Sequence, residues 1–370
     1  MKRICLLVLA LTLTRAFADP MPPIHTVFVI VLENHDWSDI EGNTNDAPYI
    51  NNTLLPAASH ARQYYNPPAS HPSLRNYVWM EAGTDFGIPA NNTPAVYHQS
   101  TTNHLVSQLQ RAGISWKTYQ EDIDGSVVPL NDVNGYAVRH DPFVYFDDVT
   151  GTNNPYCAYG ISHIRPYTEL AGDLANNTVA RYNFVTPNLC DDGHNFCLPL
   201  NNLLQQIDTW LSVEIPRIMA SPAYTNNGAI FITWDEGVNG DDGPIGLIAI
   251  SPLARGGGYF NNIHYTHSSL LRTVQEVFHV GPLLNDAANA TDLSDLFTPF
   301  SIARPAMLTN GFQLTLAGVV PGRINILETS TDYVTWQPIS TNVCITNNMT
   351  ILDSTATNSS QRFYRIREVR

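Results

Sequence analysis

The feature that most constrains the fold is a set of short, almost wholly apolar segments. Residues 25–32 read HTVFVIVL, residues 229–234 read AIFITW and residues 245–250 read IGLIAI. Runs of this kind, rich in β-branched residues, are typical of strands that are covered on both faces. Such strands occur almost only in parallel sheets, which need helices on both sides. The segments therefore predict a mainly parallel central sheet.

Helical segments lie between these apolar runs. Apolar residues recur with helical spacing in residues 102–113, 203–219 and 268–278, and further strands are expected at 114–119 and 182–185. Strands that alternate with helices along the chain are typical of α/β proteins with both faces of the sheet covered. We therefore predict an α/β domain that extends from residue 19 to about residue 300.

The composition changes near Ser301. Short alternating segments follow, among them the one that carries Phe312, Leu314 and Leu316 on one face. The pattern predicts that residues 301–370 form a small all-β accessory domain, an immunoglobulin-like sandwich. Such a domain could serve for attachment or spacing, or it could simply pack on the α/β domain.

The first 18 residues have the features of a secretory signal peptide. Lys2 and Arg3 supply a positive end, residues 4–13 are apolar, and Ala16-Phe17-Ala18 provides a small-x-small cleavage site. We expect a secreted or periplasmic protein without stable membrane insertion, because no later segment is apolar for long enough to span a bilayer. A net charge of −14 argues against a partner such as nucleic acid.

Four cysteines follow the predicted signal peptide, in an export context that permits disulfides. Cys190 and Cys197 bracket a short loop and are the favoured pair. Pairing of Cys157 with Cys190 is the alternative, with Cys344 left free. A zinc site built from Cys190, His194 and Cys197 is a further alternative, although no second cysteine pair lies at zinc-site spacing.

Polar clusters follow several of the predicted strands. Glu33-Asn34 comes after the first strand, Asp192-Gly193-His194 after the strand at 182–185, and Asp235-Glu236 after the run at 229–234. The carboxyl ends of strands are where α/β proteins place their ligands. Ser73 opens a segment with helical spacing, where a serine is commonly a helix cap but also lies close to N–H groups that favour an anion.

Taken together, these motifs resemble those of a known family. The segments ENH, HPSLRNY, RHDPF, PNLCDDGHN, TWDEG, SP and YTHSSLLRTVQEVF occur in this order between residues 25 and 280. The series is similar to that of the phosphoesterase family of bacterial and fungal acid phosphatases and phospholipases C, a branch of the alkaline phosphatase superfamily. The resemblance implies a three-layer α/β/α sandwich with a mainly parallel sheet.

The resemblance also implies a metal site. Its ligands would be the side chains of Glu33, Asn34, Asp235 and Glu236, and the oxygen of Ser73 would complete the shell. All are oxygen donors, which favour Ca²⁺, Mg²⁺ or Mn²⁺ over Zn²⁺. We expect one divalent metal ion rather than two, because Asp235-Glu236 stands where the two-zinc enzymes of the superfamily commonly have Asp-His.

By the same resemblance, Ser73 is the nucleophile and Asn76 donates a hydrogen bond to a phosphate oxygen. His140, His194 and His267 would lie across the substrate, and His140 or His194 would protonate the leaving group. One departure from the superfamily pattern is Arg75, which replaces a proline and could change the turn or add positive charge near the phosphate.

Three functions are compatible with these features. The first is an acid phosphatase that hydrolyses small phosphate monoesters through a phosphoserine intermediate. The second is a phospholipase C that cleaves a phosphodiester of a phospholipid with the same residues. The third is a non-catalytic cell-surface or glycan-binding protein, which the full set of nucleophile and ligand residues disfavours.

Overall fold

The computed structural model describes residues 21–297, 301–317, 324–343, 348–356 and 361–369. The predicted signal peptide and Cys344 lie outside these residues. An eight-stranded sheet with the order β5-β4-β6-β1-β7-β8-β2-β9 forms the centre of the larger unit. Its strands are β1 (Thr26–Leu32), β2 (Ser59–Ala61), β4 (Trp116–Gln120), β5 (Ile164–Pro166), β6 (Tyr182–Thr186), β7 (Gly228–Trp234), β8 (Leu247–Ile250) and β9 (Tyr259–Asn261).

The sheet is mainly parallel, as predicted. Strands β5, β4, β6, β1 and β7 are neighbours in this order, and each adjacent pair is parallel. Strand β8 runs antiparallel to both of its neighbours, β7 and β2. Every residue of β7 is buried, and so is every residue of β1 after Thr26. The apolar runs are therefore explained by burial on both faces of the sheet.

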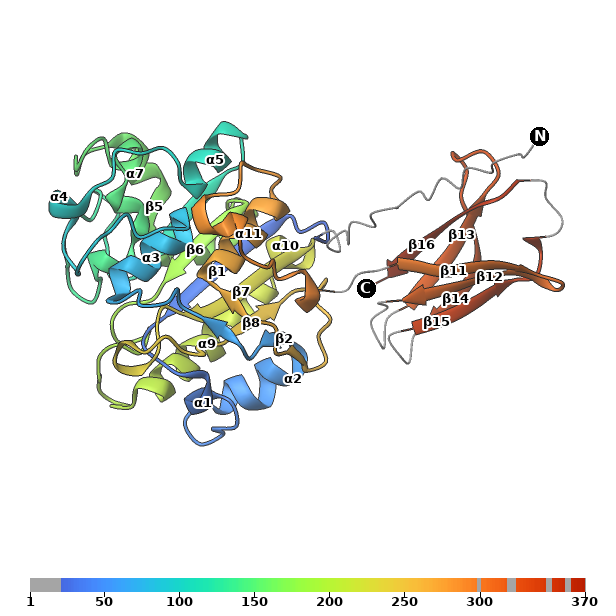
Figure 1. Cartoon of the computed structure of the whole chain (residues 1–370), viewed down its shortest axis with the longest axis horizontal. Coiled ribbons are helices and arrows are strands. Elements are labelled where there is room, and N and C mark those ends of the chain that lie inside the picture. The colour runs from blue at the N-terminus through green and yellow to red at the C-terminus, as the bar shows by residue number, and fades with distance from the viewer. Residues whose placement is uncertain (1–20, 298–300, 318–323, 344–347, 357–360, 370) are drawn as a thin grey trace, which may run out of the picture.

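Helices cover both faces, so the α/β/α class is confirmed (Figure 1). Helix α3 packs against α11 on one side, and α9 lies on the other. The helices are α1 (Trp37–Ile40), α2 (Leu55–Ala57), α3 (Ser73–Ala82), α4 (Pro94–Tyr97), α5 (Leu105–Arg111), α6 (Asp147–Thr150), α7 (Ala158–His163), α8 (Leu170–Asn176), α9 (Leu203–Met219), α10 (Pro222–Thr225) and α11 (His267–Val277). None of the helices in the described part of the chain is long and apolar enough to cross a membrane.

Shorter elements complete the larger unit. Strands β3 (Tyr64–Tyr65) and β10 (Tyr265–Thr266) form a separate parallel pair. Single helical turns of other kinds are η1 (Ile50–Leu54), η2 (Val138–His140), η3 (Pro142–Tyr145), η4 (Tyr167–Glu169), η5 (Val238–Gly240), η6 (Asn285–Ala288) and η7 (Ser294–Leu296). Of these, η2 and η3 both contact α3, and η2 carries Arg139 and His140.

The C-terminal residues form two small antiparallel sheets, which Figure 1 shows beside the larger unit. One joins β11 (Ser301–Leu308), β12 (Gly311–Ala317) and β15 (Asn348–Asp353), and the other joins β13 (Ile324–Ser330), β14 (Gln337–Val343) and β16 (Phe363–Val369). Leu314, Leu316 and Ile351 of the first sheet share a small core with Leu327 of the second. We propose a domain boundary near residue 300, and the immunoglobulin-like assignment stays a prediction.

One buried ionic cluster ties α3 to its neighbours. The ring of His104 lies between two carboxylates, with Nδ1 2.9 Å from Glu81 Oε1 and Nε2 2.9 Å from Asp148 Oδ1, and it stacks on Phe146. These acids and their hydrogen bonds outweigh desolvation and raise the pKa of His104 from 6.5 to about 9. His104 therefore stays charged at neutral pH and holds the far end of the helix that begins at Ser73.

We predict that His104→Gln lowers the free energy of unfolding by about 3–5 kcal/mol, because it leaves the buried carboxylate of Glu81 without its cation. The raised pKa means that this contribution is complete below pH 6.5, the ordinary pKa of histidine, and is lost as the pH rises through about 9. Chemical denaturation across this range measures both effects. The control is His98→Gln, which removes a half-exposed partner of Asp147 and should cost at most about 1 kcal/mol. Equal losses of unfolding free energy in the two variants would contradict the assignment of His104 as a buried, charged partner of Glu81 and Asp148.

Candidate active site

Three strands place carboxylates at one edge of the sheet. Strands β1 and β7 pair with Leu32 opposite Trp234, so Glu33 and Asp235 leave the sheet side by side. Their segments are joined by a hydrogen bond from the Asn34 backbone N–H to Asp235 Oδ1 (3.1 Å). The loop after β6 joins them, because the Glu33 N–H donates to the carbonyl of Asp192 (2.9 Å). Glu33, Asp192 and Asp235 are fully buried.

Ser73 faces this cluster from the start of α3. The cap position belongs to Pro72, so Ser73 is the first helical residue rather than the cap. Its hydroxyl donates to Glu33 Oε2 (3.2 Å), and one turn later the Tyr77 hydroxyl donates to Glu33 Oε1 (2.9 Å). Helical spacing thus directs both hydroxyls to one carboxylate. Asn34 also contacts it, with Nδ2 2.9 Å from Glu33 Oε2.

Asn76 and Glu236 form a second group beside Ser73. The amide of Asn76 donates to Glu236 Oε2 (2.9 Å) and to the carbonyl of Ser70 (2.6 Å), which uses both of its N–H bonds. His71 lies on the outer side, with its ring nitrogens 2.9 Å from Glu236 Oε2 and 2.8 Å from Asp242 Oδ1. In this arrangement Asn76 orients Glu236 and offers no free N–H to a phosphate. His71 was missed by the sequence reasoning, although it lies within the HPSLRNY segment.

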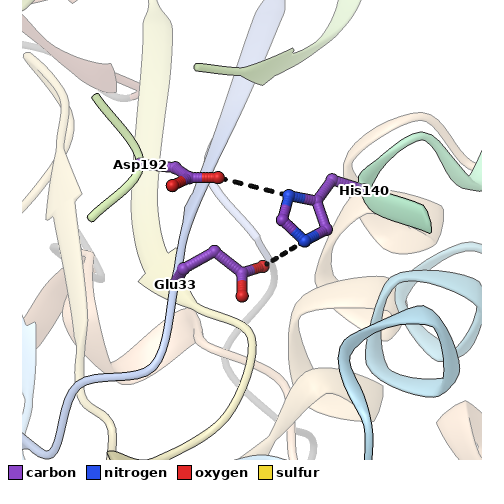
Figure 2. A group of neighbouring side chains, drawn as sticks. All are labelled: Glu33, His140 and Asp192. Carbon is purple, nitrogen blue, oxygen red and sulfur yellow. Dashed lines mark ion pairs between the residues drawn. The ribbon is translucent and has the colours of Figure 1, made fainter. Parts of the chain in front are cut away.

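His140 lies between two of the buried carboxylates (Figure 2). Its Nε2 is 3.2 Å from Glu33 Oε1 and its Nδ1 is 3.2 Å from Asp192 Oδ2, while the ring stacks on Tyr77. Burial is the main cause that holds the pKa of His140 well below its ordinary value, and Arg139 adds to it. A neutral, buried imidazole is suited to bind a metal ion or to orient carboxylates, and not to donate a proton to a leaving group.

Asp192 is the site residue that the ligand prediction omitted. Together with Glu33 and His140 it offers three ligand atoms within 4.8 Å of one another. Gly193 follows with φ +87°, and a Cβ there would lie 2.4 Å from the Ile207 side chain, so only glycine allows the loop to approach α9 this closely. The signal available in the sequence was an acidic residue before a Gly-His pair, in the loop that follows a strand.

His194 lies at the outer rim of the cluster. Arg139 Nη2 donates to His194 Nε2 (3.2 Å), and His194 Nδ1 donates to Asn195 Oδ1 (2.8 Å). These partners define a neutral tautomer whose Nε2 carries no proton. Desolvation is the main cause that holds the pKa of His194 below its ordinary value, and the charge of Arg139 lowers this pKa further. The predicted role as proton donor does not fit this arrangement.

His267 lies behind the site. Its Nε2 donates to the backbone carbonyl of Asp235 (2.7 Å), and Tyr64 places its hydroxyl 3.2 Å from Nδ1. Burial lowers the pKa of this fully enclosed ring to about 4, so it is neutral. Sequence reasoning expected His267 to contact substrate, but both ring nitrogens are engaged, and the residue holds the Asp235 segment instead.

Arg75, which departs from the superfamily pattern, makes all of its described contacts within the protein. It forms an ion pair with Asp85, and its guanidinium donates to the backbone carbonyls of Ala69 (3.0 Å) and His71 (3.1 Å). It therefore fixes the loop before Ser73. The alternative of a positive charge free to bind phosphate does not agree with these contacts.

The cluster has the electrostatics of a cation site. Burial, followed by repulsion between neighbouring acids, raises the pKa of Glu33 well above its ordinary value, and burial and Glu236 raise that of Asp235 to about 7. The buried atoms Asp235 Oδ2 and Asn76 Oδ1 have no hydrogen-bond partner among the described residues, and Asp192 Oδ2 has only the 3.2 Å approach of His140 Nδ1, which does not form a hydrogen bond. Unpartnered oxygens crowded in this way are costly unless a cation neutralises them, so the residues fit a divalent metal.

A disulfide and a cleft border the site. Cys190 is bonded to Cys197, with Cα atoms 5.6 Å apart, whereas Cys157 is a free thiol. The bond closes the loop that contains Asp192. An open cleft of about 680 Å³ lies beside this loop and reaches Asn34, and its lining includes Asp39, Asp46 and Phe196.

The profile of the Phosphoesterase family matches residues 62–281 of this chain. The chain belongs to the phosphoesterase family, whose members hydrolyse phosphoric esters. The resemblance seen in the motifs is thereby confirmed, and so is the assignment as a hydrolase that acts on ester bonds.

Individual relatives are similar to much of the chain. Phosphatidylinositol-3-phosphatase of Mycobacterium tuberculosis is 27% identical over 281 residues, which cover 76% of this chain and 85% of the relative. Phosphate-repressible acid phosphatase of Penicillium chrysogenum is 27% identical over 60% of this chain, and phospholipase C B of M. tuberculosis is 26% identical over 61% of it. The chain spans about half the length of these last two proteins, 52% and 50%.

A solved structure with a similar arrangement is the phosphonate monoester hydrolase of Agrobacterium radiobacter. The TM-score is 0.49 at 9% sequence identity, over 79% of this chain and 80% of the other.

We predict that a divalent cation raises the melting temperature of the chelator-treated protein, and raises it more at about pH 8 than at about pH 5. The metal-free site prefers protonated acids, because the folded pKa values of Glu33, Asp192 and Asp235 are raised. Protons therefore compete with the metal as the pH falls through about 7, the value for Asp235. Scanning calorimetry with Mg²⁺, Ca²⁺ and Mn²⁺ measures the shift.

Two variants sharpen this measurement. Glu33→Gln should reduce the metal-induced shift, whereas Asp124→Asn, at a fully exposed carboxylate, should leave it intact. A shift that is independent of pH, or equal in all three proteins, would show that the cation binds elsewhere.

Proposed function

We propose that the protein is an exported, metal-dependent hydrolase of phosphate monoesters, an acid phosphatase, which works through a phosphoserine intermediate. The observation that carries the proposal is the hydroxyl of Ser73, which lies 3.2 Å from Glu33 Oε2 at the rim of a buried group of carboxylates. A hydroxyl beside a proton acceptor and a cation site is the arrangement that nucleophilic attack on phosphorus needs.

The metal would be held by oxygen donors of the chain. Glu33, Asn34, Ser73, Asp235 and Glu236 are the ligands that the family resemblance implies. The geometry adds Asp192 and His140, which share one ligand triad with Glu33. A donor set with many carboxylate oxygens and one imidazole favours Mg²⁺, Ca²⁺ or Mn²⁺, and Mn²⁺ best tolerates the nitrogen. Such an ion, when bound, supplies positive charge that neutralises phosphate oxygens and lowers the pKa of the serine hydroxyl.

Ser73 and Glu33 perform the first step of the reaction. Ser73 Oγ attacks phosphorus, its proton passes to Glu33 Oε2, and the bond from phosphorus to the alcohol oxygen breaks. The alkoxide takes a proton from water, because neither His140 nor His194 presents an N–H to the substrate in this geometry. Water then attacks the phosphoserine, the bond from phosphorus to Ser73 Oγ breaks, and Ser73 takes its proton back from Glu33. The proton lost by the attacking water neutralises the hydroxide that was left when the alkoxide was protonated.

Several other residues act by positioning. Tyr77 donates to Glu33 and so keeps its second oxygen directed at Ser73. His267 fixes the carbonyl of Asp235, and Asn76 with His71 fixes Glu236. Each removes a rotational freedom that the ligand carboxylates would otherwise have, which is how supporting residues raise the affinity of a site.

Hydrolysis of phospholipids is the second candidate. The disulfide-closed loop and the residues after it expose Phe196, Leu198 and Leu200, and Phe196 also lines the cleft that reaches Asn34. An exposed apolar segment at the mouth of a site could contact lipid chains. A panel of p-nitrophenyl phosphate, glycerophosphate and phosphatidylcholine vesicles separates the candidates, because a phospholipase C would prefer the vesicles.

Export is proposed from the predicted signal peptide at residues 1–18. The disulfide between Cys190 and Cys197 supports an oxidising destination. N-terminal sequencing of the secreted protein tests the cleavage site after Ala18.

We predict that Ser73→Ala abolishes turnover of p-nitrophenyl phosphate, by at least about 10³-fold, because no other hydroxyl occupies its position. The fold and the metal content should change little, since Ser73 contributes one of several ligand oxygens. Steady-state kinetics, metal analysis and circular dichroism measure the three quantities. Ser212→Ala on α9 is the matched control and should keep full activity. Substantial activity of the Ser73 variant would exclude a serine nucleophile at this position.

A further inference from the structure

Arg139 opens the RHDPF segment, but neither the family resemblance nor the metal site gives this cation a role. It lies in η2, next to His140, and its side chain is 17% exposed. Its guanidinium donates a hydrogen bond to His194 Nε2 and lies 3.9 Å from Asp132, whose side chain is 62% exposed. A guanidinium has five N–H bonds, so most of its donor capacity remains available at the mouth of the site.

The hydrogen-bond partner of Arg139 is His194, which is neutral and acts as an acceptor. His194 Nε2 can accept from Arg139 because Nδ1 carries the proton, which it donates to Asn195. The backbone N–H of His194 donates to Asp192 Oδ1 (2.8 Å), so the backbone of His194 is tied to the carboxylate cluster. Arg139 directly precedes His140 in η2 and bonds to His194, whose ring centroid is 5.9 Å from that of His140, so Arg139 lies beside the ligand triad.

The charge of the site creates a need for such a cation. Four carboxylates surround Ser73, namely those of Glu33, Asp192, Asp235 and Glu236, and one divalent ion neutralises only half of their charge when all are ionised. A phosphate monoester brings up to two further negative charges. Arg75 is engaged by Asp85 and two carbonyls, and His71 by two carboxylates. Arg139 is thus the cation in this part of the structure with donors to spare.

We propose that Arg139 binds two non-bridging oxygens of the substrate phosphoryl group and thereby makes the site selective for monoesters over diesters. His194 is its positioning residue. This inference rests on the proposed function. A guanidinium presents two parallel N–H bonds that match two phosphate oxygens. A monoester has three non-bridging oxygens and a charge of up to −2, whereas a diester has two and a charge of −1, so the monoester gains more from the contact.

The test compares two substrates with the same leaving group in the metal-loaded enzyme, p-nitrophenyl phosphate and bis(p-nitrophenyl) phosphate. Arg139→Ala should lower kcat/KM for the monoester by about 10²–10³-fold, the usual effect of removing one transition-state donor, and for the diester by less than about 10-fold. Added guanidinium should restore part of the monoester activity. Arg217→Ala, at a half-exposed arginine paired with Glu214 on α9, is the control and should match the wild type.

A binding measurement makes the test independent of turnover. Calorimetric titration with inorganic phosphate should show binding to the wild-type protein and a loss of at least about 10-fold in affinity for Arg139→Ala. Arg139→Lys keeps the charge without the paired donors, and it should bind phosphate with intermediate affinity. Arg139→Lys also provides the test if the alanine variant fails to fold.

The outcomes separate this inference from the proposed function. An equal loss on both substrates, or unchanged phosphate binding in a folded variant, would overturn the role of Arg139. Absence of hydrolysis by the wild-type protein would contradict the proposed function alone, because the phosphate titration still decides whether Arg139 binds the anion.

Discussion

The close approach of buried carboxylates at one edge of the sheet is the constraint on which the rest of the site depends. Glu33 and Asp235 leave adjacent parallel strands, and Asp192 joins them through its carbonyl. Burial and mutual repulsion raise the pKa of Glu33 well above its ordinary range. An arrangement that is this unfavourable without a cation is suited to bind one, because metal binding relieves desolvation and repulsion together.

The surrounding residues hold these acids in place from several elements. Tyr77 reaches Glu33 from α3, and His267 reaches the Asp235 segment from the start of α11. The two helices also pack against each other. Ser73 and the buried carboxylates are therefore fixed relative to one another by the same packing that covers one face of the sheet. Preorganisation of this kind is what a site needs in order to stabilise charge without rearrangement.

Much of this could be predicted from the sequence. The uninterrupted apolar runs define strands covered on both faces, and the residues that follow them must meet at one edge, so the positions of Glu33 and Asp235 follow from local pattern. The roles of the histidines do not. Whether His267 contacts substrate or a backbone carbonyl depends on the orientation of α11, and the place of His140 between two acids depends on the path of a loop more than 100 residues away from Glu33. The position of the Arg139 side chain depends on its hydrogen bond to His194, which lies 55 residues later in the sequence.

The most direct test of the central claim is to identify the residue that becomes phosphorylated during turnover. The metal-loaded enzyme is mixed with a rapidly cleaved phosphate ester, quenched in acid, digested and examined by mass spectrometry. A phosphoryl group on Ser73, absent when the ester is omitted, is the predicted result. A phosphoryl group on another side chain, or incorporation of a solvent oxygen into phosphate in a single inversion at phosphorus, would contradict the account.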